Sequence, residues 1–189
     1  MRSVLAAPEC TCEAPLYFMY RDLARSDDDW QWLHTHHLRY DLTVIPPREI
    51  CGEYVKTKGH YHPKNAQGVG YPEIYEVLEG TVHYLLQSRS LDDVALVSAL
   101  AGDIVIIPPG YGHVSINPSS EMTLSMANIV STAFESEYGE YEALHGAAYY
   151  EMTEGELKKN PHYLGMPPAR WLEAASGRGK HRFWKGPIY

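Results

Sequence analysis

Apolar and polar residues alternate in short runs through the middle of the chain, and glycine or proline bounds most of these runs. Strand-like runs are expected at residues 41–45, 51–56, 94–100, 103–107, 113–117 and 122–130. Residues 73–87 contain two more runs on either side of Glu79-Gly80, which predicts a hairpin. Strands that recur roughly every 8–12 residues with such punctuation favour an antiparallel sandwich or barrel. The middle of the chain is therefore predicted to be all-β.

Helical signals are confined to the ends of the chain. Ser26 precedes three aspartates, and its side-chain oxygen can cap a short helix over residues 30–36. Residues 140–147 are also expected to be helical. The tail at 160–189 is rich in proline, glycine and aromatic residues, and we expect it to wrap the surface or complete a dimer. With no internal repeat or clear linker, we predict one domain over residues 1–189 with a core at about 38–132.

Composition narrows the classes of protein to consider. The 189 residues are 44% hydrophobic, which is enough for a full core, and the net charge of −8 argues against a nucleic-acid partner. No apolar run is long enough to span a membrane. The three cysteines, Cys10, Cys12 and Cys51, are odd in number, and the first two do not have the spacing of a CxxC site. We therefore expect a cytoplasmic protein in a reducing compartment, without a membrane partner.

The sequence Gly59-His60-Tyr61-His62 is the strongest chemical signal. Side chains at i and i+2 of a strand point to the same side, so two imidazoles are offered to one ion. A histidine pair alone is more often structural than metal-binding. The run at residues 34–37 has the same spacing, but it falls in the predicted helix, where i and i+2 do not share a face. We interpret those histidines as surface or core residues.

Two further side chains complete a donor set of three imidazoles and one carboxylate. Glu73 opens a predicted strand, and His113 follows the turn at Pro108-Pro109-Gly110. Such a mixed nitrogen and oxygen set suits iron(II), manganese(II), nickel(II) or zinc(II), with positions left open for substrate or water. We expect one divalent transition metal per subunit at these four residues, with iron(II) as our first choice.

The spacing of these residues follows two longer motifs. The chain carries G-x5-P-x-G-x2-H-x3-N at Gly102, Pro108, Gly110, His113 and Asn117. It carries HxH followed by E-x6-G at His60, His62, Glu73 and Gly80. Together they resemble the two motifs of the cupin superfamily, which implies a double-stranded β-helix, or jelly-roll, barrel. The chain departs from the first motif in one respect. Ten residues, 63–72, separate His62 from Glu73, where the motif usually has three or four. These residues are turn-rich and can form a loop over the site.

A closer resemblance lies in four runs of sequence, at residues 57–62 (TKGHYH), 73–80 (EIYEVLEG), 85–87 (LLQ) and 105–117 (VIIPPGYGHVSIN). These runs look like the archaeal-type (cupin) glucose-6-phosphate isomerases over roughly residues 40–130. The resemblance implies a homodimeric enzyme of glycolysis and gluconeogenesis that acts on a sugar phosphate. It places the metal on His60, His62, Glu73 and His113.

The same resemblance suggests residues that contact the substrate. The family's substrate-contacting threonines match Thr43 and Thr57, and Gly59 and Tyr75 match as well. Tyr17 is the candidate for an N-terminal tyrosine near the phosphate. The family has an aromatic residue directly after the two prolines, where this chain has Gly110. We take the next residue, Tyr111, as the candidate for that sugar contact.

Aldose–ketose isomerisation moves hydrogen between C1 and C2, and a metal stabilises an enediolate. Glu73 is our first candidate for the base, with Tyr75 beside it on the same strand face. The rival route is a hydride shift in which Glu73 only holds the metal. Lys58 has two equally plausible roles, as a surface lysine or as a cation that binds the phosphate. Two other functions stay open: a metal-dependent cupin dioxygenase, and a non-catalytic cupin that binds sugar phosphates.

Overall fold

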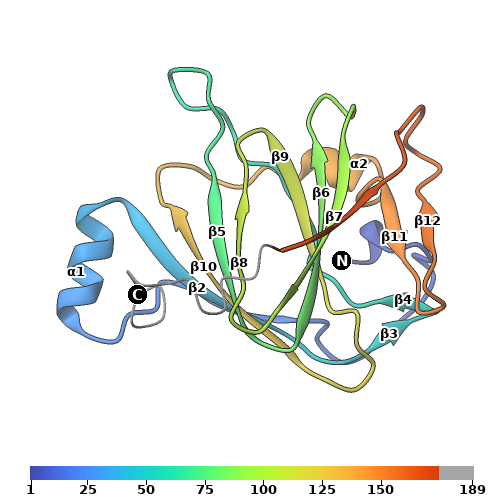
Figure 1. The fold of residues 1–189 in the computed structure, drawn as a ribbon, viewed down its shortest axis with the longest axis horizontal. Coiled ribbons are helices and arrows are strands. Elements are labelled where there is room, and N and C mark those ends of the chain that lie inside the picture. Colours follow the sequence, from blue (N-terminus) through green and yellow to red (C-terminus); the bar gives the residue numbers. More distant parts are fainter. Residues whose placement is uncertain (175–189) are drawn as a thin grey trace.

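Two β-sheets face each other across the core of the protein (Figure 1), in a computed structural model that describes residues 1–174. The larger sheet has the order β1 (Phe18–Tyr20), β2 (Leu38–Ile45), β10 (Leu124–Ser131), β5 (Glu73–Glu79) and β8 (Ile104–Ile107). The smaller has the order β13 (Arg170–Glu173), β7 (Val94–Leu100), β6 (Thr81–Ser88) and β9 (Tyr111–Ile116). This arrangement confirms the predicted all-β jelly roll.

The turn at Gly80 carries the chain from one sheet to the other. Gly80 has a φ of +81°, and a Cβ there would lie 2.6 Å from the carbonyl oxygen of Thr123. Strand β5 pairs with β10 and β8, whereas β6 pairs with β7 and β9. The predicted hairpin at residues 73–87 is therefore wrong, although both strands exist. Alternation identifies a strand but does not identify its partner, and here a glycine turn that looks like a hairpin separates two sheets.

The predicted strand at residues 51–56 is a tight hairpin instead. Strands β3 (Glu49–Ile50) and β4 (Glu53–Tyr54) pair through two residues each, around a turn at Cys51 and Gly52. Both turn residues have positive φ values, of 48° and 81°. The sequence at 51–56 gave no signal for this turn, because cysteine rarely adopts the left-handed conformation that Cys51 has here.

The same turn bears a disulfide bond. Cys51 is bonded to Cys10, 41 residues earlier, and Cys12 is exposed and free. The expectation of reduced cysteines was therefore wrong, and the cytoplasmic location that rested on it loses that support. The sequence spacing gave no sign of the pair, because only the folded chain brings the N-terminal segment to the β3–β4 turn.

The helical predictions hold at one end of the chain and only partly at the other. Helix α1 (Asp27–Thr35) begins at Ser26, whose hydroxyl accepts a hydrogen bond of 3.1 Å from the backbone N–H of Asp29. Helix α2 (Gly139–Ala143) is shorter than predicted, because the backbone enters the left-handed region at His145. A short 3-10 helix (Arg2–Val4) lies near the N-terminus, and β11 (Tyr149–Glu151) pairs with β12 (Leu157–Lys159).

The C-terminal segment adds an unpredicted parallel strand. Strand β13 pairs in parallel with β7 at the edge of the smaller sheet. This agrees with a tail that wraps the surface, while the dimer remains a prediction. Residues 175–189 of the predicted tail lie outside the described part of the chain. No helix among the described residues is long and apolar enough to cross a membrane.

The core between the sheets becomes polar toward one end of the barrel. Tyr75 and Val77 of β5 pack with Val82 and Tyr84 of β6 in a buried apolar cluster. On β2, the buried side chains include two polar ones, those of Asp41 and Thr43. Buried polar side chains are costly unless they have partners, so their concentration inside the barrel marks a site.

Candidate metal centre

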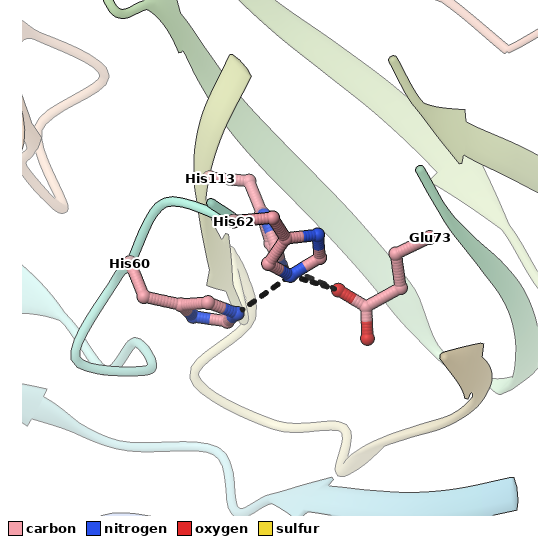
Figure 2. Close-up of side chains that lie close together, drawn as sticks. All are labelled: His60, His62, Glu73 and His113. Atoms are coloured by element: carbon pink, nitrogen blue, oxygen red, sulfur yellow. Dashed lines mark hydrogen bonds and ion pairs between the residues drawn. The ribbon is translucent and has the colours of Figure 1, made fainter. Parts of the chain in front are cut away.

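The four predicted ligands converge at one point inside the barrel (Figure 2). An isolated bridge pairs His60 with His113 of β9, with backbone hydrogen bonds of 3.3 and 3.1 Å. Alternation then brings His62 to the same side as His60, and Glu73 faces them from the start of β5. One ligand atom from each of these residues lies within 4.8 Å of all the others. The structure thus brings together residues that are up to 53 positions apart.

Adjacent donor atoms in the group are closer still. The Nε2 atoms of His60 and His62 are 3.1 Å apart. The Oε2 atom of Glu73 lies 3.4 Å from Nε2 of His62 and 3.2 Å from Nε2 of His113. His62, Glu73 and His113 are buried, and His60 is half-buried. Donor atoms from four side chains therefore surround a small volume that only His60 leaves partly open.

The electrostatics of this group fit a divalent cation. Burial, together with the neighbouring His113, holds the pKa of His60 well below its ordinary value, so the imidazole is neutral. Burial by itself raises the pKa of Glu73, but the nearby imidazoles of His113 and His62 outweigh it and lower that pKa. Oε2 of Glu73 is buried without a well-oriented hydrogen bond in the described structure. Neutral imidazoles and an ionised carboxylate are the forms that ligate metals.

Two further contacts orient the donors. The Nδ1 atom of His62 lies 2.9 Å from the carbonyl oxygen of Tyr71, which leaves Nε2 to face the other ligands. The amide Nδ2 of Asn128 donates a hydrogen bond of 2.6 Å to Oε1 of Glu73. The sequence interpretation missed Asn128. The only signal for Asn128 in the sequence was a polar residue inside an apolar strand. The register of β10 and β5 places Asn128 opposite Tyr75, two residues from Glu73, and this register cannot be read from the sequence.

Gly59 has a steric role in presenting the histidines. Its φ is +82°, and a Cβ would lie 2.6 Å from the ring of Tyr141 and 2.7 Å from a methyl group of Val114. No other residue fits this position without displacing both neighbours. This accounts for the glycine before His60, while the predicted contact of Gly59 with substrate stays a prediction.

Tyr75 belongs to the same cluster. Its hydroxyl lies 3.1 Å from Nε2 of His113, and its side chain is buried. Burial, with the nearby charge of Glu73, raises the pKa of Tyr75 well above its ordinary value. The phenol therefore keeps its proton and can act as a hydrogen-bond donor at the centre.

The predicted substrate-contacting residues on the other segments lie in different surroundings. Thr43 is buried on β2, where it pairs with Met19 of β1 and Met126 of β10. The hydroxyl of Thr57 accepts a hydrogen bond of 3.0 Å from the backbone N–H of Ser115. Tyr17 is half-buried, and burial raises its pKa. These placements leave all three available for the predicted role without testing it.

Two candidates have other partners in the structure. Tyr111 lines a pocket that His62 also lines, but its hydroxyl donates a hydrogen bond of 2.7 Å to Asp93. Lys58 forms an ion pair with Glu142, and its ammonium group lies 4.9 Å from the centre of the Tyr138 ring. The structure thus does not bring the functional groups of Tyr111 and Lys58 into the metal centre.

The other described histidines named here lie outside the converging group. His34 is exposed in α1, as predicted, with Nε2 3.0 Å from a carboxylate oxygen of Asp22. His83 lies 2.6 Å from Glu151, and the rings of His145 and His162 stack 4.3 Å apart. Of the described histidines, only the three in the converging group share a possible metal site.

Aromatic side chains form one wall of the centre. The ring of Phe134 lies 4.5 Å from that of His62, and it stacks on Tyr71 at 4.7 Å. Tyr71 ends the inserted stretch at residues 63–72, which forms a small loop closed by a bridge between Lys64 and Gly70. The long gap between His62 and Glu73 is therefore accommodated by a loop beside the site.

The jelly-roll barrel and its internal group of three imidazoles and one carboxylate define a cupin with a candidate metal centre. A model of the family described as glucose-6-phosphate isomerase (GPI) matches residues 2–166. The chain belongs to this family.

Individual relatives match a shorter part of the chain. The glucose-6-phosphate isomerases of Thermococcus litoralis and Pyrococcus furiosus are each 31% identical over 90 residues, which are 48% of this chain and 45% of each relative. The chain thus matches less than half the length of these proteins. Among solved structures, an oxalate oxidase is similar with a TM-score of 0.49, at 15% identity over 67% of this chain and 57% of that one.

Proposed function

We propose that this protein is a metal-dependent glucose-6-phosphate isomerase, which interconverts glucose 6-phosphate and fructose 6-phosphate as a cytoplasmic homodimer. The proposed role in glycolysis and gluconeogenesis, and not the state of the cysteines, is the ground for the cytoplasmic location. The observation that carries the proposal is the convergence of His60, His62, Glu73 and His113 within 4.8 Å, in a chain of this family. A divalent transition metal bound there, iron(II) as first choice or manganese(II), zinc(II) or nickel(II), supplies a Lewis acid for a sugar oxygen.

The residues of the chain would hold the sugar in a position to react. Tyr75 presents a protonated phenol beside His113 and can donate a hydrogen bond to a sugar oxygen. Thr43 and Thr57 supply hydroxyl groups for the phosphate end, together with Tyr17. The stacked rings of Phe134 and Tyr71 would pack against one side of the sugar.

Two routes for hydrogen fit these positions. In the first, Glu73 takes the proton from C2 and returns it to C1. In the second, hydrogen moves directly between the two carbons as hydride while Glu73 only holds the metal. Turnover in deuterated water distinguishes them, because proton transfer through Glu73 exchanges with solvent and a hydride shift does not. Deuterium at C1 or C2 of the product therefore supports Glu73 as the base.

Anaerobic turnover tests the proposal as a whole. Metal-loaded protein would be mixed with fructose 6-phosphate without oxygen, and the formation of glucose 6-phosphate followed. We expect turnover that disappears with EDTA and returns when metal is added. Absence of turnover, with oxygen uptake on an aromatic or enediol substrate, would instead indicate a cupin dioxygenase. Tight binding of the sugar phosphate without either reaction would indicate a binding protein.

A further inference from the structure

A cleft of about 440 Å³ adjoins the metal centre through two shared aromatic walls. Phe134 lines the cleft, and its ring lies 4.5 Å from that of His62. Tyr138 also lines it, with its ring 5.4 Å from that of His60. The volume falls within the roughly 300–1,000 Å³ of typical small-molecule sites. A ligand in this cleft would therefore lie next to the candidate ligands of the metal.

The other walls of the cleft carry charged and hydroxyl groups, from Arg21, Arg39, Ser131, Glu135 and Ser136. Two guanidinium groups in one cleft are notable in a chain with a net charge of −8. Serine hydroxyls and guanidinium groups are common donors to phosphate oxygens. With two guanidinium groups against the one carboxylate of Glu135, the lining is suited to an anionic group.

The two arginines differ in what they already bind. Arg39 donates from Nε to both carboxylate oxygens of Asp41, at 2.8 and 2.9 Å. Arg21 is exposed, and its guanidinium contacts the sulfur of Met19 at 3.9 Å. Within residues 1–174, no carboxylate lies within ion-pair distance of Arg21. Since Lys58 is paired with Glu142, Arg21 is the cation beside the centre that is free to bind an anion.

Arg21 also lies near two of the predicted phosphate contacts, Thr43 and Tyr17. It follows Met19 by two residues and touches its sulfur, and Met19 pairs with Thr43 across β1 and β2. Burial raises the pKa of Tyr17 and lowers that of His60, and the charge of Arg21 contributes to lowering both. The guanidinium is therefore within electrostatic range of the N-terminal tyrosine and of one metal ligand.

We propose that Arg21 binds the phosphate group of the substrate in this cleft and thereby sets the preference for phosphorylated sugars. The inference rests on the proposed function and adds a residue to it. A guanidinium offers two parallel N–H donors that match two phosphate oxygens, which a lysine cannot reproduce. The sugar end would then extend from the cleft past Phe134 and Tyr138 toward the metal centre.

Replacement of Arg21 tests this assignment in the metal-loaded enzyme. In Arg21→Gln, we expect KM for fructose 6-phosphate to rise about 10–100-fold, as for other hydrogen bonds to charged groups, with a smaller fall in kcat. Arg21→Lys should recover part of the loss. Arg25→Gln is the matched control. It also removes one positive charge from an exposed arginine, and Arg25 lies four positions after Arg21 in the sequence. An equal change of KM in both glutamine variants would overturn the assignment.

Binding of inorganic phosphate provides a readout that does not need turnover. By calorimetry, we expect the wild type and Arg25→Gln to bind phosphate with similar affinity, and Arg21→Gln at least tenfold more weakly. If the wild type binds phosphate through Arg21 but does not isomerise, the proposed function fails and the cleft assignment stands. If it isomerises while Arg21→Gln keeps both its KM and its phosphate affinity, only the cleft assignment fails.

Discussion

Asn128 donates a hydrogen bond of 2.6 Å to the carboxylate of Glu73, with both side chains buried inside the barrel. The bond engages Oε1 of Glu73 and leaves Oε2 directed at the imidazoles of His62 and His113. Strand β10 thereby orients a candidate metal ligand on the neighbouring strand β5. The pair links the register of β10 and β5 to the geometry of the metal centre.

Loss of this hydrogen bond should weaken metal binding. In Asn128→Leu, the carboxylate loses a buried donor and can rotate, so we expect metal affinity to fall about 10–100-fold, as is typical when the partner of a ligand is removed. Competition with a chromogenic chelator measures the change. Met126→Leu lies two residues away on the same face of β10 and should keep wild-type affinity. Unchanged affinity in Asn128→Leu would show that Glu73 is held in another way.

Removal of one imidazole from the centre should abolish metal and activity together. We expect His60→Ala and His113→Ala each to bind less than a tenth of the wild-type metal, because each variant removes one of the four converging donors and leaves an empty position in its place. Metal content by mass spectrometry and the isomerase rate would be measured on the same samples. His34→Ala removes an exposed histidine outside the cluster and is the matched control. A variant that keeps its rate after losing its metal would contradict metal-dependent catalysis.

Replacement of Thr57 should act mainly on substrate affinity. Thr57→Val removes a hydroxyl that is predicted to contact the phosphate, so we expect KM to rise about tenfold with kcat changed less. Valine also leaves the N–H of Ser115 without its side-chain acceptor, and the melting temperature should fall slightly. Thr57→Ser keeps the acceptor and should restore both values. An unchanged KM would exclude Thr57 from the phosphate site.

The sequence was sufficient to predict that His60, His62, Glu73 and His113 converge, because their spacing follows backbone geometry. His60 and His62 share a strand side, and the turn before His113 is marked by prolines and glycine. The contact of Asn128 with Glu73 and the place of Arg21 in a cleft beside Tyr138 could not be predicted, since each depends on a neighbour on another segment. The hairpin error at Gly80 has the same origin. Local pattern predicts the strand, and only long-range packing selects its partner.

The disulfide between Cys10 and Cys51 should stabilise the attachment of the N-terminal segment. It closes a loop across 41 residues, and its removal should lower the free energy of unfolding by about 2–4 kcal/mol. Chemical denaturation of Cys10→Ser measures this, and Cys12→Ser, which leaves the bond intact, should behave as the wild type. Alkylation of the non-reduced protein should label Cys12 alone. Labelling of all three cysteines would instead favour the reducing compartment expected from sequence.

The attachment of β13 to the smaller sheet should depend on the charge of Asp93. Arg170 donates to both oxygens of this carboxylate, at 2.9 and 2.8 Å, and Tyr111 donates to one of them. The hydrogen bonds from Arg170, reinforced by Tyr111, lower the pKa of Asp93 below its ordinary value. A carboxyl group with a lowered folded-state pKa stabilises the fold above its ordinary pKa, and this contribution is lost as pH falls through the lowered value.

We therefore expect amide exchange in β13 to speed up relative to β7 once the pH falls below about 4, the ordinary range of an aspartate. Titration of the Asp93 carboxyl by NMR should give a lowered pKa in the wild type and a value closer to ordinary in Arg170→Gln. That variant should exchange rapidly in β13 even at neutral pH. Arg48→Gln is the control. Among the described residues, the polar partner of the Arg48 guanidinium is the carbonyl oxygen of Pro15. If β13 exchanges at the same rate in both variants, the strand is held by its pairing with β7 and by packing alone.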